Sequence, residues 1–473
     1  MRRSVYTIIA MIVLPGLVSP AARPATALRS AEASGQAVAP GTAPAPSLSS
    51  GQVLSMSQGL GANQRFPPPE FESGYELPSP TTPEPRRNVY QYVDAAALLA
   101  ALGLSSYFVL RKRSRRAIFA LMVFSLLYFG FARKGCICSI GSIQNVVLSF
   151  FDSSYAVPIV VLVFFLLPLV FALFFGRVFC AGVCPLGAIQ DLVLLRPVSV
   201  PSWLENALRL FAYVYLAGAI LFAATGSAFV ICRYDPFVSF FRLSGNLNIL
   251  ILGGSLLLVS VFVGRPYCRF VCPYGVILRQ LSRISKWNVT ITPDECVHCR
   301  MCEDSCPFGA IREPTADWSL RDYQIGKKRL TLLIVLLPLI ALLGGWAASS
   351  VNDVTARVHA TVRLAERVYL EDTGKVDGTT DASSAFRATG KETEQLYAEA
   401  SDIRARFKLG GWLLGGFTGL VIGLKLMRLS VRRQRADYEA DRAGCLACGR
   451  CFEYCPREHA RVKSIKASAK LQP

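Results

Sequence analysis

Seven long apolar stretches, separated by short polar segments, dominate the pattern of the chain. Each is close to the roughly 20 residues that an α-helix needs to cross the hydrocarbon core of a membrane. The stretches are residues 93–110, 117–132, 155–176, 208–231, 246–264, 330–349 and 409–429. The pattern predicts a mainly α-helical protein that forms a polytopic membrane bundle of about seven spans.

The residues before the first stretch follow a different pattern. Arg2 and Arg3 precede an apolar segment that ends shortly before Ala25-Thr-Ala27. This order predicts a signal peptide over residues 1–27, with an uncleaved membrane anchor as the alternative. Residues 28–92 are rich in Pro, Ser, Ala and Gly and have no apolar period, which predicts a disordered extracytoplasmic tail.

Glycines recur every fourth residue in the last apolar stretch, at Gly411, Gly415, Gly419 and Gly423. Residues four apart lie on one face of a helix, and small residues there let two membrane helices approach closely. The spacing predicts tight packing of this span against a neighbouring helix.

Composition and charge support the membrane assignment and orient it. The chain is 52% hydrophobic and 18% charged, whereas an ordinary soluble domain carries about 25% charged residues. Basic residues gather in segments 111–116, 265–329 and 428 onward. Because cytoplasmic loops are enriched in Lys and Arg, we expect these segments in the cytoplasm of a bacterium and the bundle in its inner membrane. The net charge of +19 is then a mark of topology and not of nucleic-acid binding.

This topology divides the chain into segments. Residues 93–290 form the main membrane domain, and residues 330–429 contribute two further spans joined by an extracytoplasmic helical loop at 350–408. The remaining cytoplasmic segments, 291–329 and 430–473, contain most of the candidate chemistry.

Fifteen cysteines are present, most of them in short repeated runs. An odd number in such runs favours metal or cluster ligation over a disulfide framework. Two runs have the spacing C-x-x-C-x-x-C-x-x-x-C-P of bacterial ferredoxins, which bind [4Fe–4S] clusters. They consist of Cys296, Cys299, Cys302 and Cys306, and of Cys445, Cys448, Cys451 and Cys455. A zinc knuckle is the weaker alternative, because zinc sites use two separated pairs.

In two-cluster ferredoxins the fourth cysteine of each run ligates the other cluster. We therefore expect two [4Fe–4S] clusters with crossed ligands. Cys296, Cys299, Cys302 and Cys455 would hold one, and Cys445, Cys448, Cys451 and Cys306 the other. The fold class is then a membrane helical bundle with a split cytoplasmic ferredoxin domain, whose halves are residues 291–329 and 430–473.

A second cysteine pattern occurs twice, 88 residues apart. Each copy reads G-R-x-x-C-x-x-x-C-P-x-G and follows an apolar stretch, and the four cysteines are Cys180, Cys184, Cys268 and Cys272. Cysteines four apart share one helical face, so they are candidate redox thiols that pair, bind a metal or contact a cluster. The alternative is a structural helix cap with idle thiols.

Three further cysteines, Cys136, Cys138 and Cys232, fall on the extracytoplasmic side of the expected topology. An outer metal or redox site and inert buried thiols are equally supported interpretations.

Other cofactors have weaker signals. The segment from Asp377 to Ser383 is similar to the site at which exported proteins receive FMN through a phosphoester, with Ser383 as the attachment residue, although Asp381 replaces the usual Gly. A polar turn is the alternative. The three histidines, His298, His359 and His459, lie outside the predicted spans, which excludes a bis-histidine haem in the membrane. The C-x-x-x-C-P thiols, a quinone or a partner subunit must then carry electrons across the bilayer.

The paired C-x-x-x-C-P motifs and the two ferredoxin runs resemble the NosR/NirI family and its NapH-like and CcoG-like relatives. The resemblance implies an electron-transfer component rather than a stand-alone catalyst. Its redox partners would lie on both membrane faces: a cytoplasmic or quinol donor and an extracytoplasmic reductase. The alternative is a maturation or regulatory factor for a periplasmic metalloenzyme.

Overall fold

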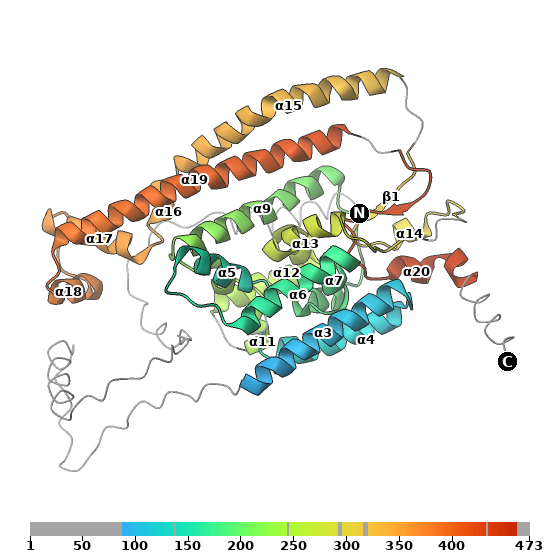
Figure 1. Cartoon of the computed structure of the whole chain (residues 1–473), viewed down its shortest axis with the longest axis horizontal. Coiled ribbons are helices and arrows are strands. Elements are labelled where there is room, and N and C mark those ends of the chain that lie inside the picture. Colours follow the sequence, from blue (N-terminus) through green and yellow to red (C-terminus); the bar gives the residue numbers. More distant parts are fainter. Residues whose placement is uncertain are drawn as a thin grey trace, which may run out of the picture. The chain divides into compact units, whose positions relative to one another are not determined.

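The computed structural model describes residues 88–135, 139–243, 246–291, 296–315, 320–431 and 434–460. The expected signal peptide, nearly all of the expected tail, Cys136 and Cys138 lie outside the described residues. Within them, the protein is mainly α-helical and contains one two-stranded sheet (Figure 1).

The elements follow one another in this order along the chain: α3 (Asn88–Leu110), α4 (Arg115–Ser125), the π-helix η2 (Leu126–Ala132), α5 (Ser142–Phe151), α6 (Ile159–Phe175), α7 (Val178–Gly182), α8 (Pro185–Leu192), α9 (Ser202–Ala224), α10 (Val230–Arg233), α11 (Val238–Arg242), α12 (Leu247–Ser260), the π-helix η3 (Tyr267–Val271), α13 (Pro273–Arg283), α14 (Met301–Asp304), β1 (Ile311–Arg312), α15 (Leu320–Ser349), α16 (Asn352–Ala356), α17 (Ala360–Asp372), α18 (Asp381–Ala388), α19 (Thr393–Ser430), β2 (Glu439–Ala440) and α20 (Arg450–Tyr454).

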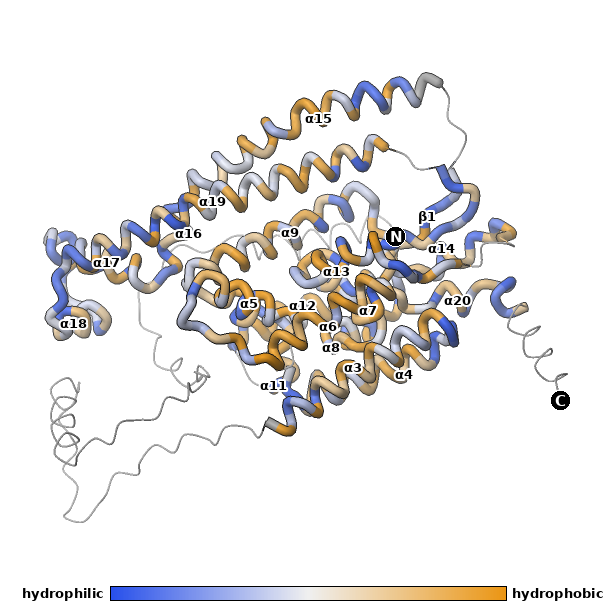
Figure 2. Tube along the Cα trace, viewed as in Figure 1, coloured by the Kyte–Doolittle hydropathy of each residue, from blue (hydrophilic) through white to orange (hydrophobic). Residues whose placement is uncertain are grey.

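Five helical segments in the described part are long and apolar enough to cross a membrane, and Figure 2 shows their apolar stretches. They are Val89–Leu110, Arg115–Ala132, Ser202–Ala224, Tyr323–Ser349 and Thr393–Ser430. Each contains or overlaps a predicted span. The other two predicted spans form the apolar helices α6 and α12, which have 17 and 14 residues. Helix α6 ends at Phe175, and the next residue, Gly176, has a φ of 72° that interrupts the helical conformation.

The one acidic residue within the first span is neutralised. Asp94 is 3% exposed, and its carboxylate lies 2.5 Å from Nη2 of Arg133 and accepts a hydrogen bond of 2.9 Å from the hydroxyl of Tyr128. A buried charge is tolerated when it is paired in this way. The contact joins α3 to the end of η2.

The glycine face predicted for the last span is confirmed. Gly411, Gly415, Gly419 and Gly423 are all buried in α19. They face α15, where Gly344, Ile340 and Leu337 approach their backbone. Helices α15 and α19 run side by side (Figure 1). The N-terminal part of α19 extends beyond the apolar stretch and packs on α17 through Val362, Val368, Ala400 and Phe407.

Enlarging Gly415 is expected to destabilise this helix pair. A Cβ at Gly415 would overlap the carbonyl oxygen of Gly344 and lie 2.6 Å from Cβ of Ala348. Overpacking of this kind costs about 1–3 kcal/mol, so Gly415→Ala should lower the thermal unfolding temperature in detergent. Gly416→Ala is the matched control, because its Cβ would meet nothing closer than the oxygen of Ala341 at 3.8 Å. If the two substitutions lowered the unfolding temperature equally, the close packing of α19 on α15 at Gly415 would be contradicted.

Candidate metal centres

The two ferredoxin runs, which are far apart in sequence, lie against each other. Strands β1 and β2 pair in antiparallel register, with Ile311 opposite Ala440 and Arg312 opposite Glu439. The backbone N–H of Asp441 donates to the carbonyl of Ala310 over 2.7 Å, and α14 contacts α20. The short sheet therefore joins the two halves into one unit.

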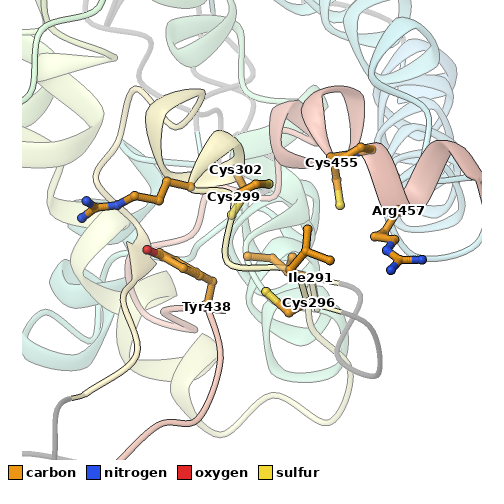
Figure 3. A pocket seen from close by; sticks show the side chains of 10 residues that line it. Ile291, Cys296, Cys299, Cys302, Tyr438, Cys455 and Arg457 are labelled. Atoms are coloured by element: carbon orange, nitrogen blue, oxygen red, sulfur yellow. The ribbon is translucent and has the colours of Figure 1, made fainter.

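One cavity of this unit is lined by four thiols. Cys296, Cys299 and Cys302 come from the first run and Cys455 from the second. Figure 3 shows the side chains of Cys299, Cys302, Cys296 and Cys455 around the cavity, with Ile291 beside them. The Cys299 side chain is exposed, whereas Cys302 is buried, so one side of this site faces the solvent.

A second cavity has the complementary set. Cys445, Cys448 and Cys451 come from the second run and Cys306 from the first. Phe308 and Leu446 are buried residues that also line it. The structure thus brings together the two sets of residues predicted for the two clusters. Three thiols from one run and one from the other are the donors that a bacterial two-cluster ferredoxin uses, so the residues present fit [4Fe–4S] clusters.

His298 lies in the chain between Val297 and Cys299, two residues that line the first cavity. Its φ is 52°, and its Nε2 lies 3.2 Å from Oδ1 of Asp437. Together with Cys296, these two residues are the one described group of three His, Cys, Asp or Glu ligand atoms within 4.8 Å of one another. The His298 and Asp437 side chains are 50% and 39% exposed, and the other three thiols of the cavity are not part of the group. These exposures favour a role for His298 and Asp437 next to the first cavity over a separate metal-ion site.

A buried carboxylate connects the ferredoxin unit to the membrane helices. Asp191, in α8, lies 2.7 Å from Arg115 at the start of α4, 3.6 Å from Arg265 and 3.5 Å from Arg450 in the second ferredoxin run. Burial alone would raise the pKa of Asp191, but the three guanidinium groups outweigh burial and lower it to about 2. The carboxylate is therefore charged at any working pH, and its stabilising effect is lost only as the pH falls from about 4 towards 2.

Part of the basic segment 111–116 contacts the same unit. Arg113 lies 2.6 Å from Glu458, and its guanidinium is 3.9 Å from the centre of the Phe452 ring. Arg115 donates to the carbonyl oxygen of Cys448 over 3.2 Å. The ferredoxin unit is thus held against the turn between α3 and α4 by charge pairs and a cation–π contact.

The remaining candidate residues have different surroundings. Cys180, Cys184, Cys268 and Cys272 are all buried, whereas Cys232 is exposed on α10. Ser383 is buried at the start of α18, where its hydroxyl and that of Thr380 form a capping box, and it also donates to Glu371 over 2.9 Å. Because this hydroxyl is enclosed and hydrogen-bonded, the geometry supports a helix cap and does not favour flavin attachment.

Comparisons with known proteins agree with these features. Two family models, each described as a 4Fe-4S binding domain, match residues 157–202 with 246–292 and residues 289–312. No solved structure matches the chain.

Three relatives illustrate how far the similarity extends. An uncharacterized protein of Methanocaldococcus jannaschii is 30% identical over 209 residues, which is 42% of this chain and 82% of that protein. YccM of Escherichia coli, named for electron transport, is 28% identical over 172 residues, which is 33% of this chain and 47% of YccM. NirI of Paracoccus denitrificans is 30% identical over 152 residues, which is 29% of this chain and 22% of NirI. The chain therefore spans about half of YccM and about a fifth of NirI.

Two four-thiol cavities of ferredoxin type, five apolar helices of membrane-spanning length and these relatives support an iron–sulfur electron-transfer role in a membrane protein. The chain belongs to the NosR/NirI-like polyferredoxin family.

Proposed function

We propose that this chain carries electrons between a cytoplasmic or quinol donor and an extracytoplasmic reductase. The observation that carries the proposal is the crossed pair of four-thiol cavities next to the membrane helices. Iron–sulfur clusters bound there would supply one-electron chemistry over a wide range of potentials.

The residues around the two cavities have distinct tasks in this proposal. The exposed Cys299 side of the first cavity lets a soluble donor approach. The second cavity faces the membrane helices, because Arg115 contacts the carbonyl of Cys448 and Arg450 contacts Asp191. Electrons would therefore enter at the first site and leave from the second.

The domain boundaries and orientation belong to the same proposal. Residues 1–27 would be a signal peptide, 28–92 an extracytoplasmic tail, and 350–408 an extracytoplasmic loop. The seven-span bundle would lie in a bacterial inner membrane with the ferredoxin unit in the cytoplasm. The basic segment 111–116 supports this orientation, because it contacts the ferredoxin unit and carries the charge expected of a cytoplasmic loop.

A second candidate function is a maturation or regulatory role towards a periplasmic metalloenzyme. It is favoured by relatives named regulatory protein NosR, from Stutzerimonas stutzeri and Pseudomonas aeruginosa. In that case the iron–sulfur sites would report on or prepare the target enzyme without carrying electrons at turnover.

A measurement of electron transfer across a lipid bilayer distinguishes the two functions. The intact protein is purified anaerobically and inserted into liposomes that contain trapped ferricyanide, and dithionite is added outside. We expect the trapped ferricyanide to be reduced faster than in liposomes with the Cys455→Ser variant, which lacks one ligand of the first cavity. Reduction at the same rate, with irons present in the unmodified protein, would contradict a transmembrane carrier and favour the regulatory role.

A further inference from the structure

A group of cations gathers where three helices meet. Helix α9 contacts both α13 and α19 (Figure 1). Lys425, near the end of α19, donates to the carbonyl oxygen of Asn206, near the start of α9. Arg209 of α9 and Arg279 of α13 are both close enough to Lys425 to repel its ammonium group. Each of the three helices therefore contributes one cation to the same place.

The arginine of α13 is buried without a counter-ion. Arg279 is 8% exposed, and its buried Nε has no hydrogen-bond partner among the described residues. Burial and the neighbouring guanidinium groups of Arg209 and Arg177 lower the pKa of Arg279 to about 9. A buried charge is costly unless it is paired, so this place favours an anionic ligand.

The nearest carboxylates already have other partners. Glu205 lies 2.7 Å from Nη2 of Arg269 and also pairs with Arg209, one turn along α9. Asp441 lies 3.6 Å from Nη2 of Arg312. One glutamate is thus shared among more cations than it can neutralise.

The cysteine sites do not account for the buried charge on α13. The strongest charge effects on Arg279 come from two arginines, a tyrosine and an aspartate, and none of them comes from a thiol. It is Arg177 whose Nη2 lies 3.8 Å from Sγ of Cys180. Arg279 also does not line either ferredoxin cavity. Its positive charge therefore serves a different ligand.

Exposed apolar side chains flank the cations. They are Trp203 and Phe211 on α9, Leu424 and Leu429 on α19, and Ile284 directly after α13. Helices α9 and α19 are long and apolar enough to cross a membrane, so these side chains face lipid in a bilayer, and tryptophan favours the membrane–water interface. A ligand with an anionic headgroup and acyl chains matches both parts of this surface.

We propose that Arg279, Arg209 and Lys425 bind the phosphate group of an anionic phospholipid between α9, α13 and α19. Guanidinium groups bind phosphate through charge-assisted, often bidentate hydrogen bonds, and lysine adds a point charge. In the orientation proposed above, the group lies at the cytoplasmic leaflet, which contains anionic lipids that bind basic sites between helices. The site goes beyond the proposed electron transfer, and no redox step depends on it. Its phosphate would hold the end of α19 against α9 and α13.

The test uses the full chain, purified anaerobically in detergent and freed of lipid. Phosphatidylglycerol, phosphatidylcholine or inorganic phosphate is added in increasing amounts, and the thermal unfolding temperature is measured at each concentration. Arg279→Gln and Lys425→Gln each remove one cation of the group. Arg116→Gln is the matched control, because it removes the same charge from an exposed residue of the basic segment 111–116.

We expect phosphatidylglycerol to raise the unfolding temperature of the unmodified protein, because a ligand that binds only the folded state stabilises it. Each of the two variants should need about tenfold or more phosphatidylglycerol for half of the rise, the effect of losing a hydrogen bond to a charged group. The control should behave like the unmodified protein. Without lipid, Arg279→Gln should unfold at the same or a higher temperature, because it removes a buried unpaired charge.

Three results would overturn the proposal. An equal rise with phosphatidylcholine would mean binding without regard to charge, and an equal rise with inorganic phosphate would mean a free anion in place of a lipid. An unchanged phosphatidylglycerol dependence of Arg279→Gln would place the lipid elsewhere, and Lys425→Gln decides the same point if Arg279→Gln does not fold. The measurement involves no electron transfer, so failure of the proposed function would leave the expected result unchanged.

Discussion

Combining Cys302→Ser with Cys455→Ser is expected to cost no more iron than either substitution alone, about four irons per chain. Both thiols line the first cavity, although they are far apart in sequence and belong to different runs. Removing either ligand opens the same cluster, since a serine oxygen is a poor substitute for the soft thiolate that iron–sulfur clusters prefer. Iron analysis and the resonance signals of the reduced protein measure the loss.

The control double variant replaces Cys306, in place of Cys455, together with Cys302. Cys306 follows Cys302 in the same run but lines the second cavity, so Cys302→Ser with Cys306→Ser should remove both clusters, about eight irons. If each run held its own cluster, the outcomes would be reversed. The Cys302 and Cys306 pair would then lose about four irons and the Cys302 and Cys455 pair about eight, which would contradict crossed ligation.

Replacing Asp191 with asparagine is expected to destabilise the protein by about 3–5 kcal/mol, the cost of removing one partner from a buried ion pair. The Asp191 side chain is fully buried and is shared by Arg115, Arg265 and Arg450. Its loss leaves Arg265, which is also fully buried, without a carboxylate partner among the described residues. A lower thermal unfolding temperature in detergent, measured on the anaerobic protein, checks this.

Glu366→Gln is the matched control for that substitution. Glu366 pairs with Arg357 over 2.8 Å, but the two side chains are 32% and 58% exposed. Exposed ion pairs contribute about 0–1 kcal/mol to stability, so this variant should unfold at a temperature close to that of the unmodified protein. If Asp191→Asn behaved like Glu366→Gln, Asp191 would not be the connection between the ferredoxin unit and the membrane helices.

Apolar length, glycine spacing and cysteine spacing predict a large part of this architecture. Five predicted spans correspond to helices of sufficient length, and the Gly411–Gly423 face packs on α15. These features are local, because each depends on the spacing of residues within one helix or one loop. The crossed grouping of the cysteines was also predictable, since the ferredoxin run has a known division of ligands.

Other features depend on contacts between distant segments, and hydropathy does not encode them. The 155–176 and 246–264 stretches are apolar, but α6 begins only after Pro158 and α12 already ends at Ser260, so both helices are shorter than the stretches. The part played by Asp191 was not predicted, because an isolated aspartate seven residues after Cys184 has no distinctive spacing. Arg177 and Arg265 were part of the repeated motif, yet only the folded chain places Arg265 beside Gly187 of the first copy and Arg177 beside Gly275 of the second copy.

The count of iron and acid-labile sulfide in the anaerobically purified full chain tests the central claim most directly. Crossed ferredoxin sites predict at least about eight irons per chain with matching sulfide, four for each cubane cluster. A count well below eight in protein that was never exposed to oxygen would contradict the two-cluster ferredoxin and the electron-transfer role built on it.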